Sequence, residues 1–186
     1  MVNLWYLHHN NYWYDYMKKY TPSGFTLIEL LLYVAMAGSM LLLTSVFLSL
    51  LLQAKVKNQT IAEVEQQGLL LSQHISQVVR NSQSVSSPTP GTSATSLVVD
   101  VVDPLLDPTT LVETSGVVTI ATGLNGPVPL TNNRVTVSDL IFENLSRPGA
   151  SDIIRVSFTI SYINNNGRNE YSYEKSFITS ATVRQH

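Results

Sequence analysis

The sequence of 186 residues predicts an α+β fold, in which one long N-terminal helix packs on a small antiparallel β-sheet domain. Three observations lead to this prediction. Residues 30–52 form an uncharged apolar run, residues 53–81 continue it as an amphipathic segment without proline, and residues 96–184 contain short alternating runs. A recurrence of apolar residues every three or four positions is typical of helices, and a two-residue alternation is typical of strands.

The apolar run from Leu30 to Leu52 has the length of a membrane span. At about 1.5 Å per residue, its 23 residues extend about 35 Å as a helix, which exceeds a hydrocarbon core of about 30 Å. Lys18 and Lys19 precede the run, so the positive-inside bias predicts that the N-terminus stays in the cytoplasm. Lys55 and Lys57 at the far end weaken this signal.

Glu29 places a carboxylate at the start of this apolar run. On insertion scales, an ionisable group at bilayer depth has an insertion free energy of about 2.5–3.5 kcal/mol. Such a residue is therefore expected to have a function that offsets this cost. The alternative is that Glu29 lies near the headgroups and only extends its carboxylate to water. The residues that precede it, Gly24 to Ile28, favour a function for Glu29 over this alternative.

The sequence Gly24-Phe25-Thr26-Leu27-Ile28-Glu29 resembles the processing site of class III signal peptides, which are found in type IV pilins and in type II secretion pseudopilins. The resemblance implies that a prepilin peptidase cuts after Gly24 and that Phe25 becomes the N-methylated first residue. It also implies that Glu29 is needed to pack subunits into a filament. Glycine before the cut lets the backbone extend into a protease cleft. The new amine at Phe25 would be compensated by a carboxylate about one turn further on.

Residues 1–24 are interpreted as the leader peptide. A Sec signal would show a basic n-region, an apolar core and a small-residue cleavage site, and residues 1–16 show none of these. The segment from Met17 to Gly24 is by itself a short basic leader. We therefore expect translation to start at Met17, with residues 1–16 untranslated. A genuine long leader is the alternative.

The second part of the helix has one apolar face. Its members recur at spacings of three and four: Ile61, Val64, Gly68, Leu71, Ile75 and Val78. Together with the apolar run this predicts one helix from Thr26 to Asn81, within a helical region of residues 25–85. Glycine inside a helix costs about 1 kcal/mol relative to alanine, so Gly68 is expected to mark close packing or a bend.

Residues 86–186 are expected to form the β-rich domain. By composition residues 84–96 are interpreted as a polar linker, and the short alternating runs follow it. Arg155 to Tyr162 alternates as a half-buried strand does, and Asn166-Gly167 predicts a hairpin turn after it. The return strand is expected at residues 171–184. The other strand candidates are residues 96–102, 116–121, 134–137 and 140–144.

Composition narrows the range of functions. From Ser86 onward there are six Lys/Arg against nine Asp/Glu, which gives no clustered positive charge for nucleic acid. The absence of cysteine excludes disulfides and thiolate sites. No catalytic arrangement is recognisable, so no enzyme activity and no cofactor are predicted.

The series Asp100, Asp103 and Asp107 lacks the EF-hand pattern and is interpreted as turn residues rather than a calcium site.

The function expected from the resemblance is that of a structural subunit, a minor pilin or pseudopilin, of a type IV pilus-like filament. Its partners would be the prepilin peptidase, other pilin or pseudopilin subunits and the cytoplasmic membrane. The precursor would cross that membrane once, with its C-terminus outside, and end in an extracellular or periplasmic filament. Two alternatives stay open: a filament-borne adhesin or DNA-uptake subunit, and a single-pass surface protein that is never cleaved. The choice between a pilus, a secretion system and a competence system also stays open.

Overall fold

The computed structural model describes residues 24–147 and 149–184, and its chain divides into two compact units. The first unit ends at Ser49 and the second begins at Leu50. A single α-helix, α2 (Leu27–Asn81), runs through both, so the predicted helix is confirmed to within one residue at its start. Its length is explained by the absence of proline from residue 25 to residue 87.

The first unit contains the apolar half of α2. This helix is long and apolar enough to cross a membrane, and the side chains of its apolar window are not buried within the chain. Two polar residues of this half donate hydrogen bonds to backbone carbonyls of the preceding helical turn. The hydroxyl of Ser39 donates to the carbonyl of Met36 at 2.8 Å, and that of Thr44 donates to the carbonyl of Met40 at 3.0 Å. Such bonds remove the need for water partners inside a bilayer.

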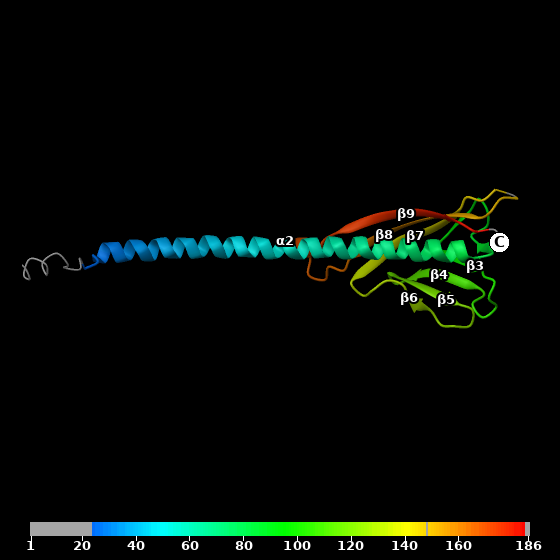
Figure 1. Cartoon of the computed structure of the whole chain (residues 1–186), viewed down its shortest axis with the longest axis horizontal. Helices are drawn as coiled ribbons and strands as arrows, with labels where there is room; N and C mark the ends of the chain where they lie inside the picture. The colour runs from blue at the N-terminus through cyan, green and yellow to red at the C-terminus, as the bar shows by residue number, and fades with distance from the viewer. Residues whose placement is uncertain (1–23, 148, 185–186) are drawn as a thin grey trace, which may run out of the picture. The chain divides into compact units, whose positions relative to one another are not determined.

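The second unit consists of the rest of α2 and two antiparallel sheets (Figure 1). One sheet has the strand order β1-β3-β4-β5-β6 and the other has the order β2-β7-β8-β9. The strand bounds are β1 (Ser84–Ser87), β2 (Ser93–Ala94), β3 (Ser96–Asp100), β4 (Thr109–Thr114), β5 (Val117–Thr122), β6 (Val128–Pro129), β7 (Val135–Asn144), β8 (Ile153–Tyr162) and β9 (Glu174–Thr182). A short 3₁₀ helix, η1 (Asn169–Tyr171), precedes β9. The predicted α+β layout, a long helix on antiparallel strands, is therefore present.

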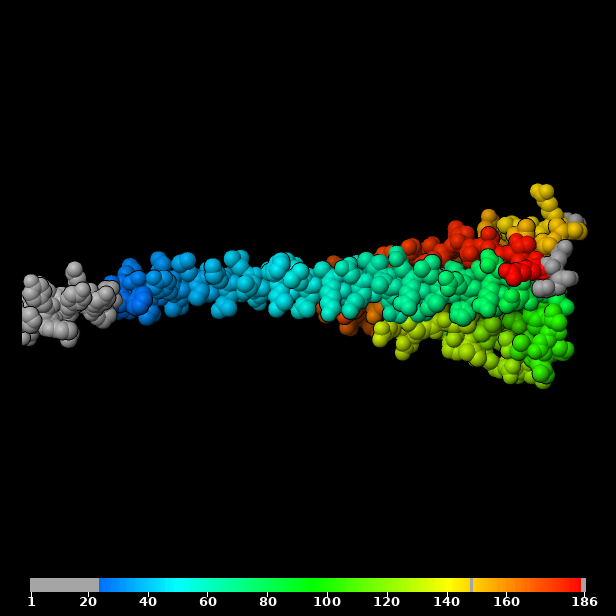
Figure 2. All heavy atoms as spheres, viewed as in Figure 1, coloured from blue at the N-terminus to red at the C-terminus, as the bar shows by residue number. Residues whose placement is uncertain are grey.

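The core of the second unit lies between α2 and the inner faces of the two sheets. The helix contributes a fully buried row with spacings of three and four: Thr60, Val64, Gly68, Leu71, Ile75 and Val79. This row agrees with the predicted face in its middle. At its ends Thr60 and Val79 are buried in place of Ile61 and Val78, which are only half-buried. In the space-filling view the opposite side of α2 is open between β9 and the sheet that contains β4 and β5 (Figure 2).

Several strand predictions need correction. Residues 84–96 are not a linker, because β1 and β2 lie there and pair with β3 and β7. Their serine-rich sequence shows no apolar alternation, so the strands were not recognisable. The strand β4 was missed, and the two candidates at residues 134–137 and 140–144 are one strand, β7, interrupted by an irregularity between Ser138 and Ile141. Residue Asp139 there has a φ of 54°, which explains the break in the alternation.

The connection between β8 and β9 also differs from the prediction. Gly167 has a φ of 64°, as a turn glycine requires, but the two strands are joined by the eleven residues 163–173 rather than by a tight hairpin. The return strand begins at Glu174 and ends at Thr182, inside the predicted range of residues 171–184. The reason is local: the carbonyls of Asn169 and Ser172 accept hydrogen bonds from Lys57 of α2, and in this connection the carbonyl of Tyr173 accepts the backbone N–H of Tyr162 at the end of β8.

Gly68 marks close packing, which is one of the two roles predicted for it; the other was a bend in the helix. A Cβ atom added to Gly68 would overlap the ring of Phe177 in β9, and that ring stacks on Phe158 of β8 with 5.5 Å between centroids. The glycine therefore lets an aromatic side chain of the sheet rest directly on the helix backbone.

Replacing Gly68 with leucine should lower the free energy of unfolding of the second unit by about 1–3 kcal/mol, because the new side chain and Phe177 compete for one space. Thermal unfolding of the full chain in detergent would measure this. Gln73→Leu, at an exposed position of the same helix, is the control and should change little. The double variant Gly68→Leu/Phe177→Ala should recover part of the loss. If it is as unstable as the two losses added together, the ring does not limit residue 68.

Candidate functional site

Gly24 and Phe25 lie before the first turn of α2 and are exposed. The side chain of Phe25 is 73% exposed. A Cβ atom built on Gly24 would meet nothing within 4 Å among the described residues, so packing in this part of the chain does not require glycine there. A glycine that the fold does not demand is compatible with a role in contact with another molecule.

Thr26 caps the N-terminus of α2. Its Oγ1 accepts a hydrogen bond from the backbone N–H of Glu29 at 3.3 Å, and its carbonyl accepts the N–H of Leu30 at 3.1 Å. The pattern Thr-x-x-Glu is that of a capping box, in which the threonine satisfies an N–H group of the first turn. Glu29 also lies in the first turn, where the helix dipole favours a negative charge by about 0.3–1 kcal/mol.

Tyr33 links two of the predicted site residues. Its hydroxyl donates a hydrogen bond to Oε1 of Glu29 at 3.2 Å. Its ring also meets the ring of Phe25 edge to face, with 6.0 Å between centroids and 76° between planes. Tyr33 was not among the predicted site residues, although side chains four residues apart on a helix lie next to each other.

The arrangement leaves the carboxylate able to bind a further donor. Glu29 is half-buried, and Tyr33 is its only side-chain partner among the residues that the structure describes. An ionised carboxylate has about four lone-pair sites, so one hydroxyl does not saturate it. A cationic amine of the same or another chain is the natural additional partner.

The aspartates considered for calcium have separate local roles. Oδ1 of Asp103 accepts the N–H of Leu105, and Oδ1 of Asp107 accepts the N–H of Val101, both at 3.0 Å. Asp100 accepts the hydroxyls of Ser84 and Ser86, and these hydrogen bonds lower the pKa of its carboxyl. These are the contacts that turn and edge residues make. Within the described residues no three His, Cys, Asp or Glu side chains form a metal-binding group.

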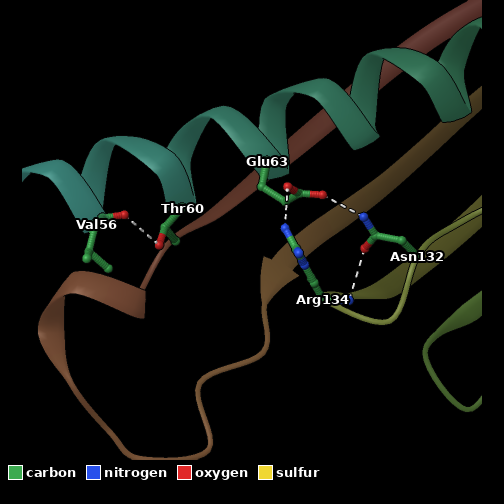
Figure 3. Close-up of polar contacts among 5 residues, drawn as sticks. All are labelled: Val56, Thr60, Glu63, Asn132 and Arg134. Atoms are coloured by element: carbon green, nitrogen blue, oxygen red, sulfur yellow. Dashed lines mark hydrogen bonds and ion pairs between the residues drawn. The ribbon is translucent and has the colours of Figure 1, made fainter.

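A polar contact that the sequence did not reveal anchors α2 to the loop before β7 (Figure 3). Glu63 accepts a hydrogen bond from Nδ2 of Asn132 and lies 3.6 Å from the guanidinium of Arg134. The amide oxygen of Asn132 in turn accepts the backbone N–H of Arg134 at 3.0 Å. Exposed ion pairs contribute little, about 0–1 kcal/mol, so the contact orients the loop more than it stabilises the unit.

The structure thus brings Phe25 and Glu29 together through Tyr33, with Gly24 at the adjoining end of the helix. The rest of the predicted leader, including Lys18 and Lys19, lies outside the described residues. Comparisons with protein-family models, with curated proteins and with solved structures found no match to this chain.

Proposed function

We propose that this chain is a structural subunit, a minor pilin or pseudopilin, of a type IV pilus-like filament. The observation that carries the proposal is the sequence from Gly24 to Glu29 at the start of a 55-residue helix. The apolar half of that helix has the length of a membrane span, and its second half packs on antiparallel sheets. A filament subunit needs these three parts in this order: a cleavage site, a helix that can leave the bilayer, and a domain that stays outside.

The proposed precursor waits in the cytoplasmic membrane with Phe25 at the inner side and the second unit outside. Cleavage after Gly24 by a prepilin peptidase would expose an amine at Phe25, and methylation would leave its positive charge. Glu29 would compensate that charge on the same or a neighbouring subunit. Thr26 would keep the first turn of the helix closed after the leader is removed, since its cap uses no residue before the cut.

Assembly would then exchange lipid for protein around the apolar half of α2. Burial of apolar surface is worth about 25 cal/mol per Å² relative to water, but lipid is as apolar as leucine, so the gain from lipid is smaller. Close packing and the pairing of Phe25 with Glu29 would therefore set which register the helices adopt. The mature subunit would end in an extracellular or periplasmic filament together with other pilin or pseudopilin subunits.

Coexpression with a prepilin peptidase should produce a chain that begins with N-methyl-phenylalanine at residue 25. Intact mass and N-terminal sequencing would identify it. Gly24→Leu should abolish cleavage without disturbing the fold, because a Cβ atom at this position meets nothing in the described chain. Gly38→Leu is the matched control, since Gly38 has equally open surroundings, and it should be cleaved normally.

An unprocessed wild-type N-terminus in the presence of active peptidase would refute the proposal and leave a plain membrane-anchored surface protein. Cleavage of Gly24→Leu at the wild-type rate would show that residue 24 is not the recognised glycine.

A further inference from the structure

One end of the second unit combines aromatic, cationic and apolar side chains next to the end of the apolar run. It comprises the turns of α2 from Leu50 to Lys57 and the loop 163–173 between β8 and β9. A groove between them is lined by Leu50, Gln53, Ala54, Lys57, Asn169, Glu170 and Ser172. We call these helical turns and this loop the basal surface.

Lys57 fixes the loop at this level of the helix. Its ammonium group donates hydrogen bonds to the carbonyls of Asn169 at 3.2 Å and Ser172 at 2.6 Å, and it lies 5.8 Å from the centre of the Tyr173 ring. Lys57 follows Leu52, the last residue of the uncharged run, by five positions, which is about 7.5 Å along a helix. The loop is therefore held within about two turns of the end of the apolar run.

The tyrosines of the second unit are all at this end. Tyr162, Tyr171 and Tyr173 are the only tyrosines after Tyr33. Tyr162 and Tyr171 stack at 5.8 Å between centroids, and Tyr173 lies under the ammonium group of Lys57. All three are half-buried, and in the described chain their hydroxyls take part in no hydrogen bond between residues. Rings with an apolar body and a polar tip are enriched where a protein crosses the membrane–water interface.

The charged residues of the second unit are also distributed unevenly between the basal surface and the rest of the unit. The basal surface contains three cations, Lys55, Lys57 and Arg168, against the single anion Glu170, with which Arg168 forms an ion pair. The remainder of the chain after residue 57 contains six Lys/Arg against ten Asp/Glu. Ile163, the first residue of the loop, is an exposed large apolar residue, and Lys55 is also exposed. The positive end of an otherwise acidic unit is thus the end that contains residues 50–57, where the uncharged run stops at Leu52.

We propose that the basal surface docks on anionic lipid headgroups of the outer leaflet while the subunit is in the membrane. The inference rests on the proposed function in one respect: it needs α2 to span the bilayer. The headgroup region adds about 5–7 Å to each side of a hydrocarbon core of about 30 Å, which matches the height of Lys57 above Leu52. Tyrosine rings, a cationic excess and an exposed isoleucine are the groups that such a layer accommodates.

The wild-type sequence contains no cysteine, so single-cysteine reporters can test the docking in the full chain. A fluorophore on Ile163→Cys reports the basal surface. The matched reporter is Leu124→Cys, a fully exposed apolar position in the β5–β6 loop. Gly123 of that loop lies next to the carbonyl of Leu105, which follows β3 in the chain. The last residue of β3, Asp100, accepts the N–H of Gln83, just after the end of α2. Along the helix axis this end of α2 is about 40 Å from Lys57.

Each labelled chain would be reconstituted in vesicles with bromine-labelled lipids, made either of phosphatidylcholine alone or of phosphatidylcholine with about a third phosphatidylglycerol. In the anionic vesicles, quenching at residue 163 should exceed quenching at residue 124 by about threefold or more. The difference should shrink in phosphatidylcholine alone. Lys55→Gln/Arg168→Gln, which leaves the Lys57 bonds in place, should lower the quenching at residue 163 about threefold in anionic vesicles. The control pair Arg80→Gln/Arg184→Gln should not.

Three results would overturn the docking proposal. They are equal quenching at the two positions, quenching at residue 163 that ignores lipid charge, and quenching that changes with the number of chains per vesicle, which would indicate contact between copies. Alkaline extraction and protease protection of the same vesicles separate this failure from the wider one. A chain that is inserted but not quenched at residue 163 refutes only the docking, whereas a chain that does not insert refutes the membrane span itself.

Discussion

Replacing Asn144 with alanine should lower the free energy of unfolding of the second unit by about 2–4 kcal/mol. Asn144 ends β7 and its side chain has no exposed surface. Its amide nitrogen donates to the carbonyl of Pro88 at 2.8 Å, and its amide oxygen accepts the backbone N–H and the hydroxyl of Ser146. Alanine would leave the Pro88 carbonyl and the Ser146 N–H buried without partners, at about 1–3 kcal/mol each.

The backbone around Asn144 shows why this loss would spread. Its carbonyl accepts the N–H of Gly91 at 2.8 Å, and its N–H donates to the carbonyl of Thr92 at 3.0 Å. The hydroxyl of Ser146 accepts the N–H of Ile153, the first residue of β8. One side chain therefore connects the loop between β1 and β2 to the ends of β7 and β8. A total stability of about 5–15 kcal/mol makes a loss of this size easy to detect.

Asn58→Ala is the matched control, because Asn58 is the other asparagine of an Asn-x-Ser/Thr triplet and lies exposed on α2. It should change stability by less than about 0.5 kcal/mol. Thermal or denaturant unfolding of the full chain in detergent, followed by circular dichroism, would compare the two. Equal stability of both variants would contradict the role assigned to Asn144. Its burial also predicts that the folded chain carries no glycan there, although the triplet matches the acceptor pattern.

The helical part of the fold could be predicted because its signals are local and repeated. A proline-free sequence with apolar residues every three or four positions specifies α2 almost to the residue. The prediction of the buried row was less accurate at its ends, since Thr60 is buried in place of Ile61. Thr60 can be buried because its hydroxyl donates to the carbonyl of Val56 at 3.1 Å, a partner that a hydrophobicity pattern does not include.

The strands were harder to predict because tertiary partners define them. Ser84 and Ser86 are in a strand since their hydroxyls bond Asp100 of the neighbouring strand, and serine-rich residues alone read as a linker. The division into two sheets depends on which strands pair, and no local pattern contains that information. The same limit applies to the site. Gly24, Phe25 and Glu29 are predicted as site residues from their order alone, whereas the contacts of Tyr33 and Asn144 emerge from geometry.

Replacing Glu29 with leucine should leave cleavage and membrane insertion intact but reduce filament incorporation at least tenfold, which corresponds to about 1.4 kcal/mol. Insertion should not suffer, because removal of a carboxylate at bilayer depth relieves a cost of about 2.5–3.5 kcal/mol. The loss should appear only when subunits pack, where the amine of Phe25 would lack its counter-charge. Counting the variant in sheared filaments against its amount in the membrane would measure the ratio.

Two further variants separate the charge of Glu29 from its shape. Glu29→Gln keeps the length of the side chain and an oxygen that can accept the Tyr33 hydroxyl, so it should be almost as defective as leucine if charge is what matters. Tyr33→Phe keeps the charge and a ring for Phe25 to contact and removes only the hydrogen bond. Since one such bond is worth about 0.5–1.5 kcal/mol, Tyr33→Phe should reduce incorporation by about two- to tenfold. Wild-type incorporation of Glu29→Gln would mean that the carboxylate only fills space, and the pairing with a cleaved N-terminus would have to be abandoned.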